Sequence, residues 1–193
     1  MIFGITGGTG CGKTTALKAI ESLGGTVLDC DAIYHALLKS DKKLLSTIES
    51  RFPGVVEKDE LQRKKLGAIV FHDPQALLDL NAITHAAIRA EVERRLAEAP
   101  ALAAIDAIEL FDSGLARLCD TTVAIVAPLE DRVQRLMKRD NISEEYARSR
   151  IAAQKSESWF RTHCDHILEN SGNLDAFATV CIDFFRGFLY NKG

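Results

Sequence analysis

The sequence predicts an α/β fold in which a doubly wound parallel sheet of about five strands carries helices on both faces. An apolar run at the N-terminus leads through a glycine-rich loop into an amphipathic helix. Short apolar runs then alternate with helical segments in residues 1–38 and 101–193, as in parallel sheets. Residues 39–100 keep helical spacing and contain no convincing strand, which predicts a helical region inserted beside the sheet.

The first element expected is a buried strand over Met1–Thr6, because this run is short and apolar. Thr15–Leu23 follows as a helix with its apolar residues on one side, and Gly24-Gly25 ends it. Gly7–Thr14, between the two, fits the pattern G-x-x-x-x-G-K-[ST], which is the phosphate-binding P-loop. A strand before and a helix after are the context that this motif requires.

The P-loop sequence predicts a site for a nucleoside triphosphate. Its glycines lack Cβ atoms, so several N–H groups can turn inward on one anion, and the helix that follows adds its positive end. Lys13 can reach the β- and γ-phosphates, and the Thr14 hydroxyl can hold Mg²⁺. The competing interpretation is a glycine-rich surface turn that matches by chance. The residues expected to bind ATP here are Gly8, Gly10, Cys11, Gly12, Lys13, Thr14 and Thr15.

A second strand over Thr26–Leu28 ends in two acidic residues, Asp29 and Asp31. Ligands bind at the carboxyl edge of such sheets, so both carboxylates should face the P-loop. One could accept a proton from an attacking hydroxyl, and the other could orient the waters of Mg²⁺. The alternative is a helix N-cap followed by a solvated aspartate.

The helical region and the second half of the chain are read from periodicity and caps. Asp73-Pro74 is a strong helix start, and Ala99-Pro100 ends that helix. Ser143 is a cap candidate in an arginine-rich polar stretch. The segments expected are helices over 44–52, 61–70, 129–138 and 175–189, and strands over 103–107, 122–127 and 164–168.

Composition limits the function classes. The 193 residues suit one domain with an insertion, and a net charge of −3 does not favour nucleic acid or an anionic membrane as partner. No apolar run approaches the ~18 residues of a membrane span. The first strand starts at residue 2 and the five cysteines form no C-x-x-C pair, so a cytoplasmic location is expected. A metal site is not favoured at His163-Cys164-Asp165-His166, because the sequence offers no second ligand pair with zinc-like spacing and the segment fits the entrance to a strand.

The order and spacing of several short motifs make the chain resemble the dephospho-coenzyme A (dephospho-CoA) kinase family over nearly its whole length. The P-loop carries most of the resemblance. The further stretches are Asp29-Cys30-Asp31, Leu61-Gln62-Arg63, Ile69-Val70-Phe71, Asn81–His85, Arg139-Asp140 with Ser143 and Ala147, Arg150–Gln154 and Asn170-Ser171-Gly172.

The resemblance implies a P-loop kinase fold and transfer of the γ-phosphoryl of ATP, with Mg²⁺, to the ribose 3′-hydroxyl of dephospho-CoA. It makes Asp31 the general base, and Lys13 and Arg139 stabilise charge. Arg63 and His85 would join Asp31 in binding the acceptor, although His85 among apolar helix positions could equally be a packed core residue. Residues 139–160 would form a lid carrying Arg139, Arg150 and Gln154, with Asn170 and Gly172 beside the adenine. A monomer or weak oligomer is expected.

The chain departs from the family pattern at several positions. Ala86 replaces the proline that usually follows the histidine, and residues 106–112 lack a usual proline, with Glu109 in place of an apolar residue and Asp112 in place of glutamate. Cys11 stands where serine is common. A thiol at a helix N-terminus is expected to have a lowered pKa, and its oxidation would block ATP binding; the alternative is a small inert residue.

Two further functions stay open from the sequence. Another nucleoside or nucleotide kinase would share the P-loop and the acidic pair. A non-catalytic P-loop protein, either a nucleotide-dependent switch or a degenerate binding protein, is the second alternative. The Asn-Lys-x-Asp box typical of guanine-selective switches is absent from the sequence.

Overall fold

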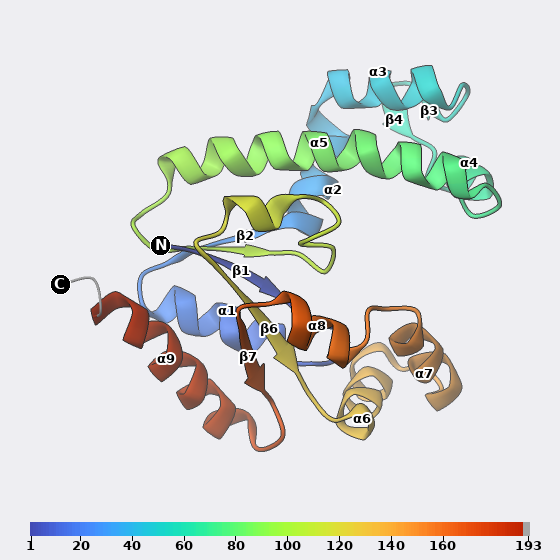
Figure 1. Ribbon diagram of the computed structural model, residues 1–193. Helices are drawn as coiled ribbons and strands as arrows, with labels where there is room; N and C mark the ends of the chain where they lie inside the picture. Colours follow the sequence, from blue (N-terminus) through green and yellow to red (C-terminus); the bar gives the residue numbers. More distant parts are fainter. Residues whose placement is uncertain (191–193) are drawn as a thin grey trace.

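A five-stranded, wholly parallel sheet forms the centre of the computed structural model, which describes residues 1–190 (Figure 1). Its strand order is β2-β5-β1-β6-β7. The strands are β1 (Ile2–Thr6), β2 (Thr26–Asp29), β5 (Ala103–Asp106), β6 (Thr121–Val126) and β7 (His166–Glu169). The prediction of about five parallel strands is confirmed; the last strand begins two residues later than expected.

Helices cover both faces of the sheet, as the doubly wound prediction requires. Helices α1 (Lys13–Ser22) and α9 (Leu174–Tyr190) lie on one face, where Phe3 and Phe185 pack edge to face at 4.9 Å (Figure 1). Helices α2 (Cys30–Ser40) and α5 (Pro74–Glu98) and the 3₁₀ turn η1 (Leu115–Leu118) lie on the other face. The buried side chains of Ile33, Val92, Ile105 and Leu110 form the core there.

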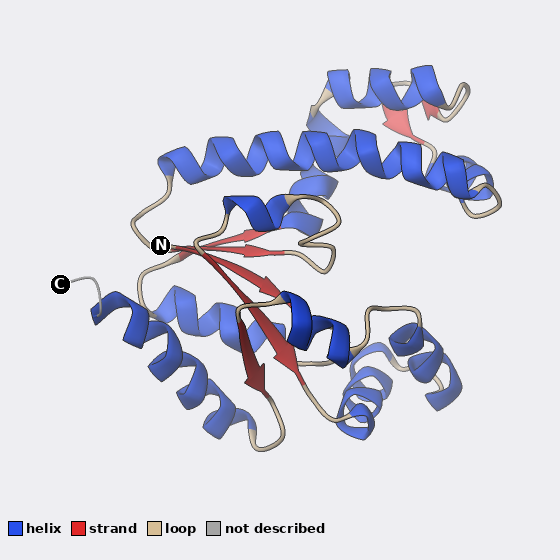
Figure 2. Ribbon diagram, viewed as in Figure 1, coloured by secondary structure: helices blue, strands red, loops and turns tan. Residues whose placement is uncertain are grey.

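The inserted region has a hydrophobic core of its own. Helices α3 (Lys42–Arg51) and α4 (Arg63–Val70) pack against α5 and bury Ile48, Phe52 and Leu66. Asp73 caps α5 by accepting hydrogen bonds from the Gln75 and Ala76 amides, as its sequence predicts. Figure 2 shows this region as helices apart from two short strands.

Those two strands correct the expectation that residues 41–100 contain none. Strands β3 (Val56–Glu57) and β4 (Glu60–Leu61) form a small antiparallel hairpin. Its turn residues, Lys58 and Asp59, have φ values of 52° and 62° without being glycines, so the usual Asn-Gly signal of a tight hairpin is missing. The Glu49 carboxylate holds the hairpin entrance by accepting from the Gly54 and Val56 amides.

Three short helices follow β6 and lead to β7. Helix α6 (Leu129–Asp140) is followed by α7 (Glu144–Ala152), which Ser143 caps by accepting from the Tyr146 amide, as predicted. Helix α8 (Glu157–His163) was not expected. Residues 191–193 of the expected core lie outside the described residues. Within residues 1–190, no helix combines the length and apolarity needed to cross a membrane.

Candidate active site

The carboxyl ends of β1, β2 and β5 meet at one edge of the sheet. In the strand register, Asp106 at the end of β5 lies opposite both Ile5 of β1 and Asp29 of β2. The P-loop leaves β1 at this edge, and α2 begins there with Asp31 in its first turn. The chain therefore brings the glycine-rich loop and three carboxylates together, as the α/β prediction requires.

The P-loop has a backbone that only glycine adopts easily. Gly7, Gly10 and Gly12 have φ values of 134°, 78° and 98°. A Cβ at Gly12 would lie 2.2 Å from the Asn170 side-chain nitrogen, so the position also lacks room. Helix α1 begins at Lys13, and within the described residues no side chain caps it. Its first N–H groups are therefore available to an anion.

Side chains from later in the chain hold the outer surface of the P-loop. Arg135 Nη1 donates to the Gly10 carbonyl at 3.2 Å, and Asn170 Nδ2 donates to the Cys11 carbonyl at 2.9 Å. Gln154 Oε1 accepts from the Thr9 amide at 2.8 Å. These contacts engage two carbonyls and one amide of the loop and hold it in place. Arg135 was not among the predicted site residues.

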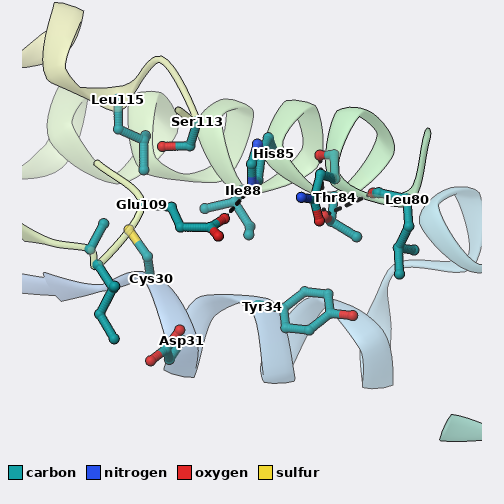
Figure 3. Close-up of a pocket in the computed structure, with 13 residues that line it drawn as sticks. Cys30, Asp31, Tyr34, Leu80, Thr84, His85, Ile88, Glu109, Ser113 and Leu115 are labelled. Carbon is teal, nitrogen blue, oxygen red and sulfur yellow. Dashed lines mark hydrogen bonds and ion pairs between the residues drawn. The ribbon is translucent and has the colours of Figure 1, made fainter. Parts of the chain in front are cut away.

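Two adjoining cavities lie at this edge of the sheet. The first, of about 450 Å³, is lined by the P-loop, including Lys13 and Thr14, and by Asp106, Arg135, Arg139 and Arg150. The second, of about 330 Å³, lies between α2 and α5, with Tyr34, Thr84 and His85 in its wall (Figure 3). Asp31 and Ile108 line both cavities. The predicted base thus stands where the two spaces meet.

Lys13 and Asp106 form an ion pair inside the first cavity. Lys13 Nζ lies 3.5 Å from Asp106 Oδ1, and both side chains are largely buried. Asp106 Oδ1 is inaccessible to solvent and accepts no hydrogen bond in the described part of the chain. Burial raises the pKa of this carboxyl, which the Lys13 charge opposes. Asp106 was not a predicted site residue, although its place at the end of a strand next to the P-loop was a usable signal.

The second cavity has a polar pair in its wall. His85 Nε2 lies 3.1 Å from Glu109 Oε2, and this hydrogen bond lowers the pKa of Glu109 (Figure 3). The His85 side chain is only 19% exposed but faces the cavity, so it is neither a core residue nor freely solvated. Arg63 lines neither cavity; its Nη2 lies 3.1 Å from His35 Nδ1, next along the chain from Tyr34.

The predicted lid arginines are paired with one acidic residue. Asp140 accepts from Arg139 at 2.7 Å and from Arg150 at 2.6 Å, and both arginines hold its pKa far below the usual range. Both arginines also line the first cavity. Lys155, after α7, forms an ion pair with Asp112 at 3.2 Å.

Three other residues predicted to bind ATP differ in how they lie relative to the P-loop and the first cavity. Asn170 is buried against the P-loop, whereas Gly172 is exposed and a Cβ there would meet nothing within 4 Å. The Thr15 amide donates to the Gly12 carbonyl at 3.0 Å, so it is engaged in the helix start. Neither Thr15 nor Gly172 is among the residues lining the first cavity.

The expected lowering of the Cys11 pKa is wrong. Cys11 is 2% exposed and belongs to the core beneath the sheet, and its burial raises the thiol pKa above the ordinary value. The positive charges of Arg132 and Lys13 oppose this rise but are weaker than desolvation. A buried, protonated thiol is a poor target for oxidation, so the redox hypothesis for Cys11 loses its basis.

The side chains of His163–His166 diverge. His163 stacks on Trp159 with ring centroids 4.0 Å apart, whereas the Asp165 carboxylate accepts from the Thr122 amide and hydroxyl at 2.8 Å. His166 packs edge-on against Phe184 and Phe188. In residues 1–190, no group of three or more metal-ligating side chains is placed to hold an ion.

Comparison with known proteins agrees with this geometry. The family model for dephospho-CoA kinase matches residues 1–176. A dephospho-CoA kinase of Corynebacterium diphtheriae is 33% identical over 97% of this chain and 96% of its own length. Among solved structures, TT1252 from Thermus thermophilus has a TM-score of 0.80 at 32% identity, covering 97% of each chain. Dephospho-CoA kinase from Campylobacter jejuni has a TM-score of 0.72 at 26% identity, covering 100% of this chain and 98% of that one. The chain therefore belongs to the dephospho-CoA kinase family, and its fold is that of a P-loop kinase.

Proposed function

We propose that the protein transfers the γ-phosphoryl of ATP to the ribose 3′-hydroxyl of dephospho-CoA, giving coenzyme A and ADP. Membership of the family supports the acceptor, and the P-loop supports the donor. The observation that carries the reaction is the position of Asp31, which lines both cavities at their junction. An acceptor hydroxyl held in the second cavity would reach the phosphate in the first beside this carboxylate.

In this proposal, the acceptor occupies the cavity between α2 and α5. Asp31 accepts the proton of the attacking hydroxyl, which becomes more nucleophilic as it approaches the γ-phosphorus. Lys13 neutralises charge on the β- and γ-phosphates, and Arg139 stabilises the charge that develops during transfer. The His85–Glu109 pair would hydrogen-bond the acceptor, and Arg63, next to the cavity wall, would approach its phosphates.

Mg²⁺ fits the oxygen groups present beside the P-loop. Thr14 and Asp106 both line the first cavity, and Asp106 presents a buried oxygen that accepts no hydrogen bond among the described residues. Hard oxygen donors of this kind suit Mg²⁺, which keeps several waters and binds phosphates as well. When bound, the ion would neutralise phosphate charge, and Thr14 and Asp106 would hold it.

Arg139 and Arg150 are proposed to leave Asp140 for the phosphates as the lid, residues 139–160, closes. Both already line the ATP cavity, so short side-chain movements suffice. Closure would exclude water, which otherwise competes with the acceptor hydroxyl.

The five free cysteines suit a reducing compartment, and we place the protein in the cytoplasm as a monomer or weak oligomer.

An acceptor panel tests the proposed function. The protein is incubated with ATP, Mg²⁺ and dephospho-CoA, coenzyme A formation is followed by mass spectrometry, and nucleosides and nucleoside monophosphates are run as competing acceptors. Coenzyme A as the dominant product supports the proposal. Faster phosphorylation of a nucleoside or nucleotide would assign another P-loop kinase, and tight ATP binding without transfer to any acceptor would favour a nucleotide-dependent switch.

A further inference from the structure

The arginines of α6, α7 and α8 are nearly all paired with carboxylates. These ion pairs are Arg135–Asp131 at 3.8 Å, Arg139–Asp140 at 2.7 Å, Arg148–Glu130 at 2.7 Å, Arg150–Asp140 at 2.6 Å and Arg161–Glu157 at 2.7 Å. Arg132 differs, because it makes no ion pair with any residue in the described range 1–190. Its charge is therefore not balanced by a neighbouring acid.

Arg132 lies directly against the P-loop. Its Nε donates to the Thr9 carbonyl at 3.0 Å. Its Nη2 lies 2.3 Å from where a Cβ of Gly8 would stand, and the Arg132 carbonyl lies 2.9 Å from where a Cβ of Gly10 would stand. Both glycines line the ATP cavity, whereas Arg132 does not, so the Arg132 guanidinium packs against the phosphate-binding loop without lining the cavity itself.

One nitrogen of this guanidinium is buried without a partner. Arg132 Nη2 is inaccessible to solvent and makes no hydrogen bond to any described residue. A guanidinium stays charged at all ordinary pH values, so it cannot relieve its desolvation by losing a proton. The Arg132 side chain as a whole is half-buried, but a polar atom of a charged group that is enclosed without a partner costs stability. The charge is felt nearby, because Arg132 is the largest single influence that lowers the pKa of the Cys11 thiol against the effect of burial.

We propose that Arg132 is a positioning residue whose fixed positive charge, behind the P-loop, is compensated only when a polyphosphate occupies the loop. Lys13 and the start of α1 act on the phosphates from the cavity side, and Arg132 acts through the loop without touching them. The same side chain also holds the P-loop in place by donating a hydrogen bond to the Thr9 carbonyl. Ligand-free protein thus carries an electrostatic cost that ATP removes, which makes binding tighter for ligands of higher negative charge.

Two substitutions separate charge from the loop tie. Arg132→Gln removes the charge and keeps a donor, whereas Arg132→Lys keeps the charge and loses the planar fork. We expect Arg132→Gln to unfold at the same or higher temperature than wild type without ligand. It should bind ATP more weakly on the order of tenfold, which is what one unit charge contributes across about 12 Å at an effective dielectric near 20. The loss should be smaller for ADP and absent for adenosine. Arg132→Lys should keep most of the ATP affinity.

The measurements are thermal unfolding without ligand and calorimetric titration with ATP, ADP and adenosine in fixed salt. Arg94→Gln is the matched control, because Arg94 is paired with Glu91 and Glu98 on the surface of α5, does not line the ATP cavity and should leave ATP affinity unchanged. If binding of ATP, ADP and adenosine weakened equally and both Arg132 variants unfolded at lower temperatures, Arg132 would have only a structural role and the proposal would be wrong. Unchanged ATP affinity in Arg132→Gln would also overturn the proposal. Circular dichroism establishes that each variant is folded.

Discussion

The proposed role of Asp31 leads to a prediction in which catalysis and folding separate. Asp31→Asn replaces the carboxylate at the junction of the two cavities with a neutral group of nearly the same shape. We expect the turnover rate to fall by the 10²–10⁴ typical of losing a general base, about 2.7–5.5 kcal/mol in activation free energy. ATP binding should stay the same or tighten, because a negative charge beside the phosphates has been removed.

The structure also indicates how little Asp31→Asn should cost in stability. Asp31 is exposed, and its side chain makes no hydrogen bond to any of the residues described. Asp29, two residues earlier, caps α2 instead by accepting from the Ala32 amide at 2.9 Å. The free energy of unfolding of the variant should therefore stay within about 0.5 kcal/mol of wild type.

Asp29→Asn is the matched control, since it makes the same change of charge next to the same site. Asparagine caps a helix about as well as aspartate, so this variant should fold normally and turn over within about threefold of wild type. Steady-state ADP release with dephospho-CoA, measured beside ATP titration, gives both quantities. Turnover of Asp31→Asn close to wild type, or an equal loss in Asp29→Asn, would remove Asp31 from the role of base.

Three further predictions test the loop, the helical region and the acid response. Gly12→Ala should weaken ATP binding about tenfold or more, because alanine is strained at a φ of 98° and its Cβ would meet Asn170. Gly24→Ala is the control: its φ is also positive, at 83°, but a Cβ there meets nothing within 4 Å, so ATP affinity should stay unchanged in the same titration. Phe52→Ala should lower the free energy of unfolding by about 3–5 kcal/mol in urea because Phe52 is 2% exposed, whereas Phe71→Ala, 84% exposed, should change it little. Hydrogen bonds from Thr122 lower the pKa of Asp165, so the stability they give is present above pH about 4 and is lost as pH falls through the folded-state pKa. The difference in free energy of unfolding between wild type and Asp165→Ala, measured by urea titration, should therefore shrink under acid.

Local signals in the sequence predicted the elements whose ends are set by their own residues. Asp73 and Ser143 each accept amide hydrogen bonds at the start of the expected helix. The hairpin of β3 and β4 escaped prediction because Lys58 and Asp59 adopt positive φ without the residues that usually allow it. Helix α8 has a cap in Ser156, but its seven residues are too few to show a helical period.

In the site, the sequence indicated which residue types are functional, but not which side chains contact one another. The pair Asp29 and Asp31 was recognisable as functional, but only the structure separates them, with Asp29 as the cap and Asp31 at the cavities. Partner choice between long side chains depends on packing across helices that meet only in three dimensions. For this reason the sharing of Asp140 by Arg139 and Arg150, and the unpaired state of Arg132 within residues 1–190, were not predictable from spacing.

The departures of residues 106–112 from the family pattern acquire a physical explanation in these contacts. Glu109, in place of an apolar residue, turns to His85 on α5, and Asp112 pairs with Lys155 in the loop between α7 and α8. Each unusual acid therefore has a partner outside the segment, one on a helix and one in a loop. Glu109 and Asp112 are both more than half exposed, so each polar pair contributes no more than about 1 kcal/mol. Together the two pairs connect the segment to α5 and to the loop after α7, where the family pattern has a proline that would restrict the backbone directly.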